Sequence, residues 1–103
     1  MSQFQNVTIT KAANIYFDGN VTSRVVHFTD GSTKTLGIML PGEYVFDTTA
    51  AEQMEILAGD LDIQLPDQEW RTIAAGESFG VPANASFKLR IRTVTDYCCS
   101  YLD

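Results

Sequence analysis

The chain has 103 residues, of which 45% are apolar and 19% charged, so it predicts one ordered globular domain spanning residues 1–103. Thirteen acidic side chains stand against seven basic ones, for a formal net charge of −6, and the basic residues are mostly scattered. A nucleic-acid-binding domain normally carries a basic stripe, so no polynucleotide partner is expected.

No stretch approaches the roughly 20 consecutive apolar residues that span a bilayer, so no membrane partner is expected either. The N-terminal MSQFQNVTITK has no charged region followed by an apolar one, which predicts a protein without a signal peptide, located in the cytoplasm. Cys98 and Cys99 are adjacent, with Cα atoms about 3.8 Å apart across a trans peptide. Disulfides usually span about 4.4–6.8 Å, so we expect two reduced thiols on opposite faces of a strand.

Alternation of apolar and polar residues is the main structural signal in the chain. In chain order, RVVHF (24–28) and TLGIML (35–40) predict two strands of a hairpin around the Asp-Gly turn in TDGST (29–33). Further alternating stretches follow at 60–65, 87–92 and 96–101. Short strands separated by frequent turn signals predict an all-β, antiparallel sandwich or barrel.

One segment competes with this reading. Thr49 to Glu52 matches the Ser/Thr-x-x-Glu capping box, and the AAEQMEIL that overlaps it contains good helix formers. A single helical turn there is an alternative to a strand, but Gly59 follows too soon for a long helix.

Two motif halves resemble those of the cupin superfamily of small β-barrels. Glu52 to Gly59 satisfies E(X)6G, and Gly76 to Pro82 satisfies G(X)5P, in the family's order. The resemblance implies a cupin-like antiparallel barrel of jelly-roll type with at most one short helical turn.

The metal ligands of that family are missing from this chain. The first two histidine places fall on Val45 and Asp47, or on Phe46 and Thr48, and the third falls on Phe87. Metals such as zinc or iron require several imidazoles and carboxylates in convergence. The single histidine, His27, lies outside both motifs and is expected to be a surface or half-buried strand residue. We therefore expect no metal.

A more specific resemblance covers residues 12–103. The segments LGIMLPGEYVFDT, EQMEILAGDLDIQLP and GESFGVPANASFKL resemble the cupin-like pyrimidine/purine nucleoside phosphorylases, with residues 1–11 forming an extension outside the likeness. The resemblance implies phosphorolysis of several nucleosides to a free base and a pentose 1-phosphate by a homodimer, without a metal or other cofactor and with phosphate as co-substrate. A cupin that binds a small molecule without catalysis is the alternative.

Strand parity suggests which side chains would line the pocket of such a barrel. Aromatic faces stack on any base, the Glu52 carboxylate can accept hydrogen bonds from a ribose, and the Thr48 and Ser86 hydroxyls together with a guanidinium suit phosphate. The candidate substrate-binding residues are Tyr44, Phe46, Thr48, Glu52, Phe79, Ser86, Phe87 and Tyr97, and the candidate phosphate-binding residues are Arg24 and Arg90.

Each candidate also has a purely structural interpretation. The aromatic residues fit an ordinary barrel core, and Glu52 and Thr48 fit a capping box or a turn. Arg24 and Arg90 fit solvated strand positions, and simple alternation turns Arg90 away from Phe87.

Overall fold

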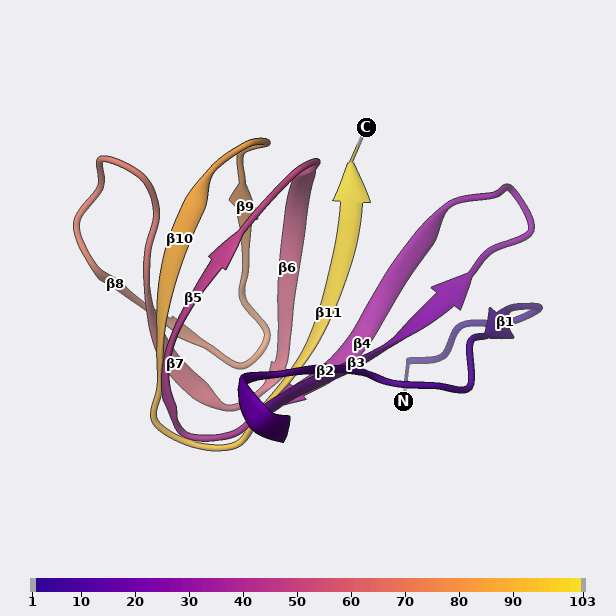
Figure 1. Cartoon of the computed structure of the whole chain (residues 1–103), viewed down its shortest axis with the longest axis horizontal. Coiled ribbons are helices and arrows are strands. Elements are labelled where there is room, and N and C mark those ends of the chain that lie inside the picture. The colour runs from indigo at the N-terminus through magenta and orange to yellow at the C-terminus, as the bar shows by residue number, and fades with distance from the viewer. Residues whose placement is uncertain (1, 103) are drawn as a thin grey trace.

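The computed structural model of the chain describes residues 2–102 and is built almost entirely of antiparallel strands (Figure 1). The strands are β1 (Thr8–Ile9), β2 (Asn14–Tyr16), β3 (Val21–His27), β4 (Thr33–Met39), β5 (Gly42–Asp47), β6 (Ala51–Ala58), β7 (Asp60–Gln64), β8 (Arg71–Ala74), β9 (Ser78–Val81), β10 (Ser86–Ile91) and β11 (Thr95–Leu102). One 3₁₀ turn, η1 (Phe17–Gly19), follows β2.

The strands form two sheets that face each other. The larger sheet has the order β1-β3-β4-β11-β6-β9, with β2 also paired to β3, and the smaller has the order β5-β10-β7-β8. All strand pairs are antiparallel, and most neighbours in the sheets are not consecutive in the chain. This arrangement confirms the predicted all-β, jelly-roll barrel.

The core lies between the two sheets and follows the predicted alternation. Leu61 and Ile63 of β7, Leu89 of β10, and Met39 and Ile56 from the opposite sheet are almost completely buried. Burying a side chain of this size contributes about 1.5–3 kcal/mol each before the entropy cost of folding is subtracted. Period-2 patterning therefore sets which face of each strand lines the interior.

The predicted hairpin is present and positions one wall of the interior. Strands β3 and β4 pair from Val21↔Met39 to His27↔Thr33, and the Asp-Gly turn lies between them, with Gly31 at φ 89°. In Figure 1 this hairpin reaches to the right, away from the smaller sheet, so its outer half extends past the barrel.

The alternative of a helical turn after Thr49 is wrong. Residues 51–58 form β6, which pairs with β11 on one edge and with β9 on the other, and Met54 and Ile56 point into the core. Two ladders of backbone hydrogen bonds and a buried apolar face outweigh a helix preference of a few tenths of a kcal/mol per residue. No helix among residues 2–102 is long and apolar enough to cross a membrane.

The adjacent cysteines are both buried and unpaired, as predicted. Cys99 shares the inner face of β11 with Tyr97, and Cys98 packs on the outer face beside Leu36 and Leu57.

Candidate active site

A cavity of about 160 Å³ opens between the two sheets, beside the base of the β3–β4 hairpin. Six strands and the end of β2 contribute to its wall, which combines aromatic rings, two carboxylates, three hydroxyls and a thiol. The lining residues are Tyr16, Ser23, Met39, Phe46, Asp47, Glu52, Met54, Phe87, Leu89, Tyr97 and Cys99.

Aromatic rings form one side of the cavity. Phe46 of β5 stacks on Phe87 of β10 with ring centroids 6.2 Å apart and planes at 29°. Tyr16 and Phe17 meet Phe46 edge to face, with centroids 5.9 and 5.3 Å away. Tyr16 lines the cavity and remains 43% exposed, so it lies at the rim, while Phe17 is equally exposed and packs on Phe46 from outside the lining. A flat ligand entering here meets ring faces and edges that suit a nucleobase.

The opposite side carries Glu52 of β6, held by the last strand. The Cys99 thiol donates a hydrogen bond to Oε1 of Glu52 at 3.5 Å, and Cys99 is itself hydrogen-bonded to Tyr101. The Tyr101 hydroxyl lies 3.4 Å from Oγ1 of Thr35. These contacts join four side chains from β6, β11 and β4 into one hydrogen-bonded network that begins at the cavity.

Burial shifts the pKa values of the side chains in this network. Desolvation raises the pKa of Glu52 above its ordinary value, and the Cys99 hydrogen bond only partly offsets the rise. Desolvation and the nearby Glu52 charge raise the pKa of Cys99 to about 12, and burial raises that of Tyr101 to about 12. Both therefore stay protonated donors at neutral pH, whereas Glu52 is the group whose charge changes most readily.

Tyr97 forms the floor of the cavity. Its ring lies directly over Gly37, where a Cβ would be 2.6 Å from the Tyr97 hydroxyl oxygen. The hydroxyl is hydrogen-bonded to Ser23, which accepts a bond from Nδ2 of Asn14 at 3.2 Å. Burial raises the pKa of Tyr97, so the phenol keeps its proton. A second polar chain thus reaches the cavity from β2 and β3.

Four of the eight predicted substrate-binding residues meet at the cavity, namely Phe46, Glu52, Phe87 and Tyr97. The other four lie elsewhere. Tyr44 donates to the Leu40 carbonyl at 2.7 Å inside the core, and Phe79 packs behind Phe87 with centroids 6.4 Å apart. Ser86 is exposed on the outer side of the smaller sheet, beside Lys88.

Thr48 is buried, but its hydroxyl is hydrogen-bonded to a neighbouring turn and does not line the cavity. Oγ1 donates to the Pro82 carbonyl at 2.7 Å and accepts from the Ala85 amide at 3.0 Å. It thereby ties the end of β5 to the turn before β10.

Neither predicted phosphate-binding arginine lines the cavity. Arg24 is exposed on β3, where its Nε donates to the Lys11 carbonyl at 3.2 Å. Arg90 lies on the outer face of the smaller sheet, with its guanidinium carbon 3.9 Å from the Trp70 ring centroid and Nε 3.4 Å from Glu43. The interpretation of both as strand residues outside the pocket fits these positions.

Sequence reasoning missed Tyr16, Ser23, Asp47 and Cys99 as cavity residues. The alternation that placed Tyr97 on the inner face also places Cys99 there, so that residue had a usable signal. Tyr16 and Ser23 belong to a wall that the curvature of the larger sheet creates, and the sequence pattern carries no sign of it.

The comparisons with known proteins agree with this geometry, first at the level of the fold. An RmlC-like cupin from Shewanella frigidimarina superimposes with a TM-score of 0.70 at 17% identity, covering 97% of this chain and 86% of that one. A protein of unknown function from Acinetobacter sp. ADP1 superimposes with a TM-score of 0.93 at 41% identity, covering 97% and 98%. The fold is therefore cupin-like, and its cavity forms a polar and aromatic pocket.

The family follows from the sequence itself. A family model described as pyrimidine/purine nucleoside phosphorylase matches residues 11–101. A pyrimidine/purine nucleoside phosphorylase from Chlorobium chlorochromatii is 74% identical over 99% of both chains, and one from Hydrogenovibrio crunogenus is 62% identical over the full length of both. The chain belongs to the pyrimidine/purine nucleoside phosphorylase family.

Proposed function

We propose that this protein catalyses the phosphorolysis of purine and pyrimidine nucleosides. The observation that carries the proposal is the full-length identity of 60–74% with relatives named pyrimidine/purine nucleoside phosphorylases. In the reaction, a phosphate oxygen forms a bond to the anomeric carbon as the N-glycosidic bond breaks. The bond's electron pair leaves with the base, which takes up a proton, and the other product is a pentose 1-phosphate.

The cavity supports this chemistry by positioning and electrostatics. Phosphate is the nucleophile, so no activated serine or cysteine is required, and the protein's task is to align the reactants. The paired rings of Phe46 and Phe87 hold the base through π-faces that every base offers, which fits acceptance of both purines and pyrimidines.

The sugar is proposed to lie against Glu52 and Tyr97. The Glu52 carboxylate accepts hydrogen bonds from ribose hydroxyls and, being half-buried, acts in a poorly solvated setting where such bonds are strong. It also favours the positive charge that develops on the ribosyl ring as the glycosidic bond breaks. The Tyr97 phenol donates to the substrate from the cavity floor.

The proposal includes phosphate as the co-substrate with no metal or other cofactor, a homodimer, and the cytoplasm as the location. The homodimer is supported by apolar side chains that gather on the outer face of the larger sheet, where Leu36, Leu57 and Phe4 are all more than a third exposed. The cytoplasm is supported by the two unpaired cysteines, since free thiols persist in reducing compartments.

The direct test is to incubate purified protein with inosine or uridine, with and without phosphate, and to follow the free base by chromatography. Base release that requires phosphate and yields a pentose 1-phosphate is the expected result. If nucleosides raise the melting temperature but no base appears across several nucleosides, the protein is a binding module and the proposal fails.

A further inference from the structure

The cavity described above lacks a cation, although the reaction proposed for it uses an anion. Its lining includes the Asp47 and Glu52 carboxylates, and no Lys, Arg or His lines it among residues 2–102. Inorganic phosphate at neutral pH is itself negatively charged, and two like charges at close range repel strongly in a partly desolvated site. Any Lys, Arg or His side chain that holds phosphate therefore lies outside the cavity lining.

The larger sheet continues past the cavity along the β3–β4 hairpin. Directly opposed residues of an antiparallel pair project to the same face, so the register fixes which hairpin residues share the inner face with the cavity. Ser23 and Tyr97 line the cavity and both pair with Gly37. Stepping by two residues from Ser23, the inner face of β3 continues through Val25 to His27.

His27 lies in the same cross-strand row as Glu52. Glu52 of β6 pairs with Tyr101 of β11, and His27 of β3 pairs with Thr33 of β4. The β11–β4 register runs to Ser100↔Lys34, and one further step sets Tyr101 opposite Thr33. Neighbouring strands lie about 4.8 Å apart, so the three steps separate the ends of the row by about 14 Å.

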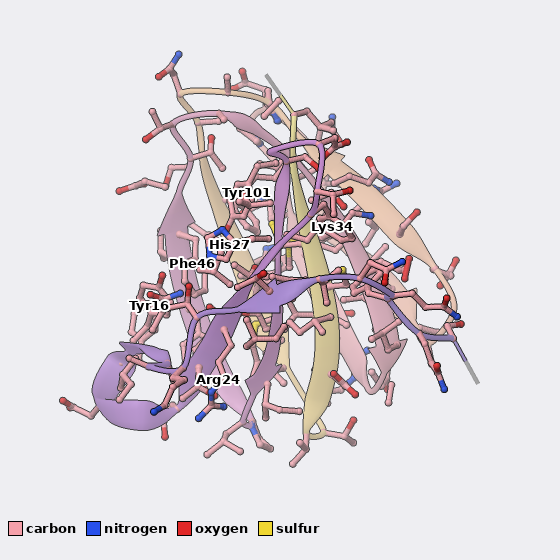
Figure 2. All side chains as sticks on the ribbon, turned by 90° about the vertical axis from the view of Figure 1, so that its right-hand side faces the viewer. Tyr16, Arg24, His27, Lys34, Phe46 and Tyr101 are labelled. Atoms are coloured by element: carbon pink, nitrogen blue, oxygen red, sulfur yellow. The ribbon has the colours of Figure 1, made fainter. Side chains whose placement is uncertain are left out.

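The side chains between the two ends of the row include hydrogen-bond donors that suit an anion. Between the Glu52 carboxylate and the His27 imidazole the face presents the Tyr101 phenol and the Thr33 hydroxyl, both of which can donate, while Thr35 is buried with its hydroxyl 3.4 Å from that of Tyr101. Tyr101 is 40% exposed and His27 is exposed, because the hairpin extends beyond the smaller sheet. In Figure 2, viewed from the hairpin side, His27 lies at a height between Tyr101 and Phe46, with Arg24 well below, and Figure 1 shows that β3 ends to the right of β11 and β5.

His27 is the only side chain on this face of β3, β4 and β11 that can carry a positive charge. Arg24 pairs with Leu36 and Lys34 pairs with Val26, so both project to the outer face. Lys34 is engaged there, with Nζ 5.4 Å from the Phe4 ring centroid and 5.8 Å from that of Phe28. The His27 ring is fixed from one side by Oγ1 of Thr10, 2.7 Å from Nε2, and no side chain or backbone group of residues 2–102 is hydrogen-bonded to Nδ1.

We propose that His27 binds the phosphate co-substrate at the open end of a row that begins at Glu52. Glu52 holds the sugar at one end, phosphate lies on the Tyr101–Thr33 segment against the imidazole, and its oxygen faces the anomeric carbon. This inference rests on the phosphorolysis proposed above. It replaces Arg24 and Arg90 as the phosphate-binding candidates.

The first experiment compares His27→Gln with Lys34→Gln, a matched change on the opposite face of the same hairpin. We expect His27→Gln to raise KM for phosphate about tenfold or more, the effect of losing one hydrogen bond to a charged group, while KM for the nucleoside is unchanged. Lys34→Gln is expected to leave both constants at the wild-type values. An unchanged KM for phosphate in His27→Gln overturns the inference.

Phosphate binding measured by calorimetry without nucleoside separates this inference from the proposed activity. Loss of phosphate binding in His27→Gln supports the inference even if the wild-type protein releases no base, in which case only the proposed activity fails. Equal phosphate affinity in both proteins overturns the inference even if the wild-type protein is fully active.

A third experiment asks whether the row belongs to a single chain. Glu52→Gln and His27→Gln chains are co-expressed so that they mix in any oligomer they form. If Glu52 and His27 of one site belong to the same chain, every chain in the mixture lacks one of the two residues. Activity then stays at the level of the two variants. If the partner copy instead supplied His27, random pairing in a two-fold dimer would restore about a quarter of the sites, and that recovery overturns the single-chain row.

Discussion

The Cys99 thiol donates its hydrogen bond to Oε1 of Glu52 from the neighbouring strand, with 3.5 Å between sulfur and oxygen. The two residues are offset by two positions in register, since Glu52 pairs with Tyr101 and Cys99 pairs with Met54. The contact therefore runs diagonally across the inner face of the larger sheet. It couples a carboxyl group with a raised pKa to a thiol with a raised pKa, and each partner provides a probe of the other.

The pH dependence of activity is expected to follow Glu52. Its role as an acceptor requires the ionised form, so kcat/KM falls as pH drops through its pKa, and burial makes that fall begin at a higher pH than for an ordinary glutamate. The Cys99 hydrogen bond lowers this pKa, so Cys99→Ala is expected to move the acidic limb of the pH profile further up. Identical profiles for the two proteins would contradict the coupling.

Glu55→Gln is the matched control for Glu52→Gln, because Glu55 lies on the same strand but on its exposed face. We expect Glu52→Gln to lower kcat/KM by roughly 10–100-fold, the loss of a charged hydrogen bond worth about 1.5–3 kcal/mol. Glu55→Gln is expected to leave it unchanged.

Alkylation rates of Cys98 and Cys99 test the contact between Glu52 and Cys99 through the reactivity of the thiol. Burial, and then the charge and hydrogen bond of Glu52, raise the pKa of Cys99 to about 12, so very little reactive thiolate exists near neutral pH. Glu52→Gln removes the charge and is expected to accelerate iodoacetamide labelling of Cys99, measured by mass spectrometry of peptides. Cys98 provides an internal control because its raised pKa depends on burial and on Glu55 among its charged neighbours, with no contribution from Glu52. Equal acceleration at both cysteines would indicate general loosening of the fold and refute the specific contact.

The sequence predicted the inward-facing side chains well wherever a strand is regular. Phe46, Phe87 and Tyr97 each lie at an alternating position, and each lines the cavity. Alternation needs only the pleat of one strand, which is a local property of the backbone. It says nothing about which inner-face positions border open space and which are packed, so the same pattern also assigns Tyr44 and Phe79 to the cavity, although both lie in the core.

The remaining differences come from contacts between segments far apart in the chain. Thr48 has the sequence context of a cap, but its hydroxyl binds two groups in the turn before β10. His27 stands outside every motif, and only the register across β6, β11, β4 and β3 puts it in a row with Glu52. Such pairings are set by the topology of the whole barrel, which no short window of sequence encodes.

Thr48→Val tests the structural role of that hydroxyl. Valine has nearly the same shape but leaves the Pro82 carbonyl and the Ala85 amide without their partner in a site where Thr48 is only 7% exposed. We expect a loss of about 1–3 kcal/mol in the free energy of unfolding, measured with urea. Thr48→Ser keeps the hydroxyl and is expected to lose less. Equal losses in the two variants would show that the methyl group, rather than the hydroxyl, carries the stability.

Gly37→Ala tests how closely the cavity floor is packed. The added Cβ would lie 2.6 Å from the Tyr97 ring and its hydroxyl oxygen, and it would also collide with the Thr22 carbonyl oxygen. Neither the ring nor the backbone can give way freely, so we expect a loss of about 1–3 kcal/mol in stability, together with weaker nucleoside binding as Tyr97 is displaced.

Gly80→Ala is the matched control for this change, because its new Cβ would meet the end of the flexible Gln53 side chain at 3.3 Å and the Glu52 carbonyl oxygen at an ordinary contact distance of 3.9 Å. It is expected to change stability by no more than about 0.5 kcal/mol and to leave nucleoside binding intact. Urea unfolding and the KM for nucleoside measure the two effects separately. A Gly37→Ala protein that is destabilised but binds nucleoside normally would show that Tyr97 supports the fold without contacting the substrate.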